Sequence, residues 1–359
     1  MEELFISLSY LNKLTQQLNQ YFSAFGFGVT NTELGYCLEG NEINIRLFSY
    51  LFLQDSFQDI DWPFPTITIK SIYSDIPSEI LVDSHKRSNS KNRSLSILYA
   101  VLKTRIKKQN YTSQPKAESM QSFFSIIQEN FDIALIFQKD TFGSLNIETK
   151  ATEIHYFNFL FRVFNSDVIP KSEKVELGKI FFEADHPYCT LSKDILAASS
   201  GLIHHELSDR NKYLFVYFIT LFNVLFFLIG DAVDGFTNLF IPPLSFRVNA
   251  KDEYMTAIKN KIASFTDNKS QFSLLASLLY TLYTSELKPE IKIYLQMSKD
   301  FTSSFFIENR LNNFFNNNQI IITDNYSLAD IVVTDTLERS TSTLNNTIFY
   351  LDSISNETC

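Results

Sequence analysis

Sharp turns are scarce in this chain, because only nine glycines and nine prolines occur in 359 residues. Sheets that fold back on themselves need a turn every few residues, whereas long helices need few, so the scarcity favours a mainly α protein. A chain of this length exceeds one ordinary hydrophobic core, which predicts several domains. The hydrophobic fraction of 45% is typical of a globular protein rather than of a disordered chain.

The charge of the chain restricts how it could contact nucleic acid. The formal net charge is −9, whereas a surface that grips phosphates over its whole extent is basic. The strongest local exception lies between Asp83 and Glu118, where nine Lys or Arg residues and no acid occur. Its helical part carries a basic patch: Lys103, Arg105, Lys107 and Lys108. The patch indicates either a contact with DNA phosphate or an acidic partner, or a solvated helix face.

Cysteine usage and the first residues indicate a cytoplasmic protein without a bound cofactor. Cys37, Cys189 and Cys359 lie far apart, so neither a disulfide framework nor a CxxC metal site is expected. The acidic start lacks the basic region of a signal peptide. No glycine follows Gly235, and the close pair Gly26 and Gly28 lacks the third glycine of a dinucleotide-binding motif.

One uncharged apolar segment, Tyr213–Gly230, has two interpretations. Its 18 residues reach the lower limit of a membrane-spanning helix. The alternative is a helix buried on all sides in a bundle, with Thr220 and Asn223 hydrogen-bonded inside. We expect the buried helix and no membrane partner, because a single short span is a poor anchor.

The N-terminal residues predict a helix, a hairpin and a second helix. Leucines and a phenylalanine recur at helical spacing between Leu8 and Phe22, with Ser7 or Ser9 as the N-cap. Two short strands follow, near residues 26–29 and 35–38, and another helix spans residues 43–53. This order is the second half of a winged helix-turn-helix, in which the first of these helices would lie in the DNA major groove.

Five short elements follow one another in this region: Glu3-Leu4-Phe5-Ile6-Ser7, Leu18-Asn19, Phe25-Gly26-Phe27, Leu38-Glu39-Gly40-Asn41-Glu42 and Ile45-Arg46. In this order they resemble the second helix-turn-helix of the Mga family, which comprises transcriptional regulators of virulence in Gram-positive pathogens. Family members carry two helix-turn-helix units, two phosphotransferase-regulated helical domains (PRDs) and a C-terminal domain similar to a phosphotransferase IIB component. The chain has these proportions, but it lacks the residues before the turn of the second unit and is expected to be N-terminally truncated.

The resemblance implies four domains in a mainly α, multidomain protein. These are a partial winged helix-turn-helix at 1–58, PRD-like helical bundles at 59–167 and 168–289, and a small IIB-like α/β domain at 290–359. It also implies promoter DNA as a partner, provided that the missing N-terminal region is present. The implied DNA-contacting residues on the recognition helix are Ser9, Tyr10, Asn12, Lys13 and Gln16. Residues 1–60 hold only Lys13 and Arg46 against seven acids, so tight DNA binding by this chain alone is not expected.

The periodicity of the remaining chain agrees with these domains. Apolar residues at helical spacing predict helices at 95–106, 123–134, 154–164 and 272–282. The last part changes period and predicts strands at 292–297, 319–323, 331–334 and 348–351 with a helix at 302–315, which is a small parallel α/β layer. IIB phosphocarriers have a cysteine after the first strand, where this chain has Ser298-Lys299-Asp300, so phosphoryl transfer through this domain is not expected.

Two histidines are the regulatory phosphorylation candidates that the resemblance implies. His85 lies beside Lys86 and Arg87, and His155 lies on a predicted helix. The phosphotransferase histidine carrier protein would be the phosphoryl donor. The pair His204-His205 lacks the i, i+4 spacing of a zinc-protease helix, and no metal site is expected.

Three functions follow in order of preference. The first is a Mga-like transcriptional regulator that is not an enzyme, and the second is a regulatory or dimerisation module that does not itself bind DNA. The third is a cytosolic enzyme of unrecognised type. Either regulator is expected to form a homodimer through the aromatic segment Phe301–Phe315.

Overall fold

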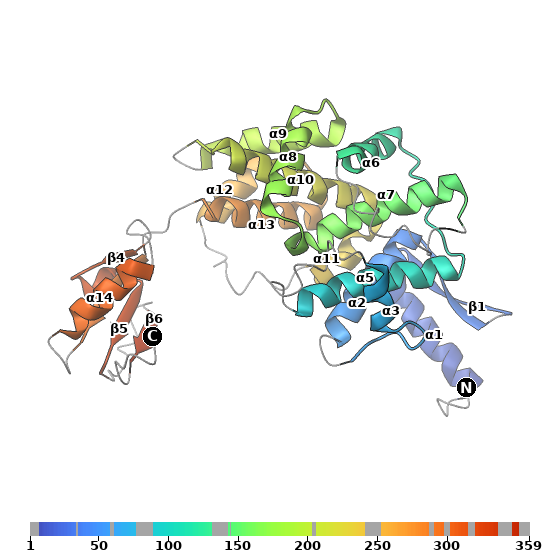
Figure 1. Cartoon of the computed structure of the whole chain (residues 1–359), viewed down its shortest axis with the longest axis horizontal. Helices are drawn as coiled ribbons and strands as arrows, with labels where there is room; N and C mark the ends of the chain where they lie inside the picture. Colours follow the sequence, from blue (N-terminus) through green and yellow to red (C-terminus); the bar gives the residue numbers. More distant parts are fainter. Residues whose placement is uncertain are drawn as a thin grey trace. The chain divides into compact units, whose positions relative to one another are not determined.

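The computed structural model divides the chain into two compact units, residues 1–280 and residues 281–359 (Figure 1). The structure describes residues 7–33, 35–57, 61–76, 89–130, 143, 145–202, 206–240, 253–286, 291–297, 302–314, 320–336 and 347–351, without the side chains of 89–91, 167 and 238–240. The two units are described separately below.

The first unit begins with the winged part that the local pattern predicts. Helix α1 (Leu8–Phe22) starts at Ser7, whose hydroxyl accepts a hydrogen bond from the Tyr10 amide at 3.2 Å, so Ser7 is the N-cap. A short 3₁₀ turn η2 (Ser23–Phe25) leads into the antiparallel strands β1 (Phe27–Thr32) and β2 (Gly35–Gly40). Helix α2 (Glu42–Phe57) completes the winged part and confirms the predicted order.

Helix α2 is built into the core of the helices that follow it. These are α3 (Ile69–Asp75), α5 (Asn89–Lys107), α6 (Glu118–Asn130) and α7 (Ile147–Phe164). Tyr50 of α2 belongs to the same buried hydrophobic cluster as Leu95 and Leu98 of α5 and Phe157 of α7. The winged part therefore shares apolar packing with the helical region.

Among the remaining helices of the first unit, α8 and α9 pack on one apolar helix, α10, and α12 packs on α9. In order, the elements are η5 (Ser166–Val168), α8 (Lys171–Glu183), α9 (Pro187–Ser199), η6 (Ser200–Leu202), α10 (Asp209–Ile229), η7 (Gly230–Ala232), α11 (Val233–Phe240), α12 (Glu253–Ile262) and α13 (Lys269–Thr284). Helices α8 and α10 approach closely at Gly178, where a Cβ would lie 2.1 Å from the Tyr213 carbonyl oxygen. A side chain at this position would force the two helices apart.

The apolar helix α10 is the only candidate membrane span among the described helices. The segment Asp209–Thr237 is long and apolar enough to cross a membrane, but 61% of its most apolar window is buried inside the protein. Asn223 is buried and its side-chain amide donates to the Ser192 hydroxyl at 3.5 Å, as predicted. The prediction for Thr220 is wrong, because its buried hydroxyl has no hydrogen-bond partner among the described residues. The contacts of α10 are those of a core helix.

The second unit is a parallel α/β layer, as the change of period predicts. Its elements are β3 (Ile291–Gln296), α14 (Ser303–Phe314), β4 (Ile320–Ile322), η9 (Tyr326–Leu328), β5 (Ile331–Thr334) and β6 (Thr347–Tyr350). The strand order is β4-β3-β5-β6, and every pair is parallel. The loop Ser298-Lys299-Asp300 and the terminal Cys359 lie outside the described residues.

Candidate nucleic-acid interface

The first predicted DNA-contacting surface is one face of helix α1. At 100° per residue, the five predicted residues fall on one face of the helix, and all of them are exposed. Tyr10 is 51% exposed, and Asn12 accepts a hydrogen bond from the Tyr36 hydroxyl of the wing at 3.3 Å. Helix α1 has no buried residue, so this face is open to a partner.

Asn19 fixes α1 to the wing. Its side-chain amide donates to the Val29 carbonyl at 2.9 Å, and its side-chain oxygen accepts from the Val29 amide at 2.6 Å. Phe22 adds a stacked contact with Phe27, with 4.9 Å between ring centroids, and an edge contact with Phe48 of α2. Because these anchors all lie in the second half of α1, the C-terminal end of the helix is held more firmly than its N-terminal end.

Arg46 joins the winged part to helix α7 through a buried ion pair. Its guanidinium contacts both carboxylate oxygens of Glu153, through Nη1 and, at 3.0 Å, through Nη2. The Arg46 side chain is 3% exposed and the Glu153 side chain 0% exposed. Arg46 Nη2 also donates to the Asn110 carbonyl at 2.9 Å, and the Thr112 amide donates to Glu153 at 2.8 Å. This bidentate geometry is that of a strong charge-assisted pair.

The charges around Arg46 raise its pKa. Burial by itself lowers the pKa of a guanidinium, but the hydrogen bond and charge of Glu153, followed by those of Glu42, outweigh it. The net pKa of Arg46 therefore lies above its ordinary value. Arg46 is thus permanently charged and enclosed by protein, so of the two cations counted in residues 1–60 only Lys13 is exposed to solvent.

The predicted basic patch divides into two pairs of residues. Arg105 donates to Glu42 at 2.9 Å through Nε and pairs with it at 2.5 Å through Nη2, while Lys103 pairs with Asp75. Lys107 and Lys108, in contrast, are exposed at the end of α5. Neutralisation within the protein therefore leaves two exposed cations out of four for a phosphate or an acidic partner.

Helix α11 provides a second attachment of the winged part. A Cβ on Gly235 would lie 2.3 Å from the Ala24 carbonyl oxygen, so only glycine permits this approach. Beside it, the rings of Phe236 and Phe25 meet edge to face, with 5.0 Å between centroids. Sequence reasoning missed this contact, although the isolated Gly235 inside a helical pattern is a signal of close packing.

Of the histidines discussed from the sequence, only His155 lies among the described residues. His85, His204 and His205 lie outside the described residues. His155 lies half-buried on α7, with its ring 5.9 Å from that of Phe124. No group of His, Cys, Asp and Glu that could hold a metal ion occurs among the described residues.

His186, which sequence reasoning did not single out, is a structural histidine. It is buried at the start of α9, where its Nδ1 accepts from the Tyr188 amide at 3.3 Å. Its Nε2 lies 2.8 Å from the Ser119 carbonyl, which can only accept, so Nε2 carries the proton. His186 thus joins α9 to the start of α6.

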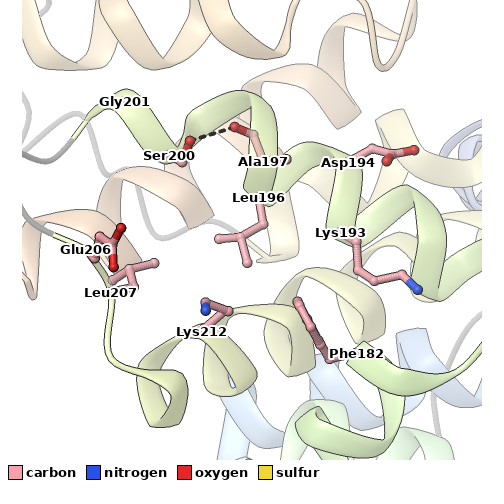
Figure 2. A pocket seen from close by; sticks show the side chains of 10 residues that line it. All are labelled: Phe182, Lys193, Asp194, Leu196, Ala197, Ser200, Gly201, Glu206, Leu207 and Lys212. Atoms are coloured by element: carbon pink, nitrogen blue, oxygen red, sulfur yellow. Dashed lines mark hydrogen bonds between the residues drawn. The ribbon is translucent and has the colours of Figure 1, made fainter.

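A large cavity in the helical region lies between α8, α9, η6 and the start of α10 (Figure 2). Its volume is about 750 Å³, and Phe182, Leu196 and Leu207 form its apolar walls. Both lysines on its wall have protein partners, because Lys193 donates to the Ala184 carbonyl at 3.0 Å and Lys212 to Asp209 at 3.1 Å.

An exposed, capped helix followed by a hairpin and a second helix has the order of the second half of a winged helix-turn-helix. Residues 1–53 match the family model of the Mga helix-turn-helix domain. This match confirms the predicted resemblance over those residues, and the helix-turn-helix domain that it identifies indicates a transcription regulator. No curated protein matches the chain.

Proposed function

We propose that this chain is a DNA-binding transcription regulator of the Mga type that acts in the cytoplasm. The winged part would contact promoter DNA with α1. The helical region would act as PRD-like regulatory bundles, and residues 290–359 would act as a IIB-like contact domain. The observation that carries the proposal is the open polar face of α1 on a segment that matches the Mga helix-turn-helix model.

Electrostatics restrict how this contact would work. Each neutralised phosphate contributes affinity, and the winged part offers Lys13 as its exposed cation. Additional cations must come from elsewhere, and the exposed Lys107 and Lys108 are available for this role. We therefore propose weak binding by one chain, which a second copy of the chain would strengthen.

Selection from a pool of random duplexes at low salt tests DNA binding by α1. The full chain is expected to enrich a sequence motif, and the Lys13→Ala/Gln16→Ala variant is expected to lose it because both side chains lie on the exposed face. Lys179→Ala on α8 is the matched control. An unchanged motif in the α1 variant would contradict the role of this helix.

The remaining cations of the patch are tested by the salt dependence of DNA retardation. Lys107→Glu/Lys108→Glu should weaken retention at low salt without breaking an ion pair of the described residues. Lys103→Glu or Arg105→Glu would also disrupt the pairs with Asp75 or Glu42, so these variants require a parallel stability measurement. If Lys107→Glu/Lys108→Glu retained DNA as strongly as the parent chain, these two lysines would have no role in DNA binding.

A second candidate function is a regulatory or dimerisation module that does not bind DNA itself. The observation that favours it is the burial of Arg46, which leaves one exposed cation beside seven acids in residues 1–60. The same selection separates the two functions, because this module would enrich no motif while still forming dimers.

We also propose a homodimer through the second unit. On α14, Phe305 and Phe314 are 70% and 73% exposed, which is unusual for large aromatic side chains. Sedimentation at micromolar concentrations should give a dimer, and Phe305→Lys/Phe314→Lys should shift it to monomer. A monomer throughout that range in the parent chain would refute this assembly.

Phosphorylation by the histidine carrier protein is the proposed input signal. A phosphohistidine at His85, beside Lys86 and Arg87, would form charge-assisted hydrogen bonds. Labelling with the phosphorylated carrier should fall strongly in His85→Ala and less in His155→Ala, because His155 is half-buried. Equal labelling of the parent chain, His85→Ala and His155→Ala would place the phosphorylation site elsewhere. No labelling of the parent chain would contradict phosphorylation as the input signal.

A further inference from the structure

A second cavity lies between the end of α7 and helices α10 and α13. Its volume is about 340 Å³, at the small end of the range of about 300–1,000 Å³ for ligand pockets. One stripe of α10, together with α13, supplies most of its wall: Phe218, Leu221, Phe222, Leu225, Phe226, Leu274 and Leu278. The lining is therefore almost entirely aliphatic and aromatic.

The polar lining is concentrated at the α7 end of this cavity. Arg162, which is fully buried, and Ser166 both lie there. The Ser166 hydroxyl is buried and has no hydrogen-bond partner among the described residues. Arg162 pairs with Glu173 through Nη2 at 3.0 Å. Because a guanidinium presents a fork of five N–H donors, it can serve Glu173 and a second carboxylate together.

We propose that this cavity binds a medium-length saturated carboxylate, that is, a fatty acid. The carboxylate would lie against Arg162 and Ser166, since a charge enclosed by apolar walls requires a charged or hydrogen-bonding partner. The hydrocarbon chain would lie along the α10 stripe. From Phe218 to Phe226 this stripe is about 12 Å long at 1.5 Å per residue, which matches an extended chain such as that of decanoate.

Such a ligand would bridge parts of the chain that are distant in sequence. Helix α7 carries both Arg162, at this cavity, and Glu153, which pairs with Arg46 of the winged part. Occupation of the cavity would therefore order the helix that anchors the winged part. The binding itself does not depend on the DNA-binding function proposed above.

Calorimetry with the full chain and a series of saturated carboxylates, each below its micelle concentration, tests the site. We expect saturable binding of one equivalent, strongest for octanoate or decanoate, and weaker for hexanoate and tetradecanoate. Methyl decanoate, which keeps the chain and loses the charge, should bind at least tenfold more weakly. No binding of any carboxylate to the folded parent chain would overturn the proposal.

Three variants test where the carboxylate binds without removing the buried Arg162. Leu278→Trp places bulk in this cavity and should abolish binding, whereas Leu207→Trp places it in the larger cavity and should leave binding unchanged. Ser166→Ala should weaken binding severalfold. If Leu278→Trp proves unfolded by circular dichroism, Leu278→Phe replaces it. Equal binding by the parent chain and a folded filled-cavity variant would place the ligand elsewhere and refute the site.

Discussion

At the scale of single residues, Glu153 is the most consequential side chain of the first unit. It is completely buried, and it accepts hydrogen bonds from Arg46 and from the Thr112 amide. A buried pair is costly to desolvate, so its formation adds little net stability, but the loss of one partner leaves a buried charge without compensation. The pair therefore specifies where α2 docks more than it adds to total stability.

Glu153→Gln should lower the free energy of unfolding by about 3–5 kcal/mol, since Arg46 then keeps its charge with less compensation. Urea denaturation followed by circular dichroism measures the change. The matched control is Glu183→Gln, which removes an exposed i, i+4 partner of Lys179 and should change stability by about 0.5 kcal/mol or less. A loss of less than about 1 kcal/mol in Glu153→Gln would show that water reaches the pair.

At the scale of elements, the contact of α11 with η2 decides how the winged part sits on the rest of the first unit. The backbones approach so closely at Gly235 that no side chain fits between them. Phe25 then packs on Phe236 on one side, and on the other its carbonyl accepts a hydrogen bond from the side-chain amide of the buried Asn44 at 3.0 Å. The contact is therefore held by shape and not by charge.

Gly235→Ala should destabilise the first unit by about 1–3 kcal/mol, because the added methyl group overlaps the Ala24 carbonyl. Amide hydrogen exchange should increase in η2 and β1 more than in α5. Gly201→Ala is the matched control, since no atom lies within 4 Å of its Cβ position. Equal exchange in both variants would mean that the helices absorb the overlap without releasing the winged part.

Local sequence patterns predicted the elements well and their partners poorly. The α1 periodicity, the two short strands after it and the strand runs of the second unit each reflect neighbouring residues, and the structure confirms them. Arg46 and Glu153 are 107 positions apart, and no periodicity indicates that two such charges meet. For the same reason Arg46 was counted among the cations available to DNA. The α11 contact depends on backbone shape, which a side-chain pattern does not encode.

At the scale of the whole molecule, buried acidic groups set the response to alkaline pH. Burial, together with the Glu153 charge, raises the pKa of Tyr156 from 10.0 to about 12. Burial also raises the pKa of Tyr217 to about 12 and that of the Cys189 thiol, against the opposing effect of Lys193, from 9.0 to about 12. Each group is neutral in the folded protein at this pH, whereas in the unfolded chain the same group loses its proton at a lower pH.

The stability from these groups is thus fully present below about pH 9 and is lost as the pH rises through about 12. The unfolding free energy should be flat near neutral pH and fall steeply above pH 10. Tyr156→Phe should lessen the total fall by on the order of 3 kcal/mol, because a shift of about two pKa units is worth about 1.4 kcal/mol per unit. Denaturation curves measured across this pH range give the free energy of unfolding at each pH. If this free energy fell with the same slope in the parent chain and in Tyr156→Phe, Tyr156 would not contribute to the pH dependence.

The absence of buried residues in α1 has a thermodynamic consequence for binding. Isolated helices of about this length are marginal in water, and α1 is held mainly at its C-terminal half by Asn19 and Phe22. The half that carries Ser9, Asn12 and Lys13 therefore frays most readily. A partner that orders these residues must offset their conformational entropy, so association should be enthalpy-driven, with a heat-capacity decrease larger than rigid surfaces of the same area would give.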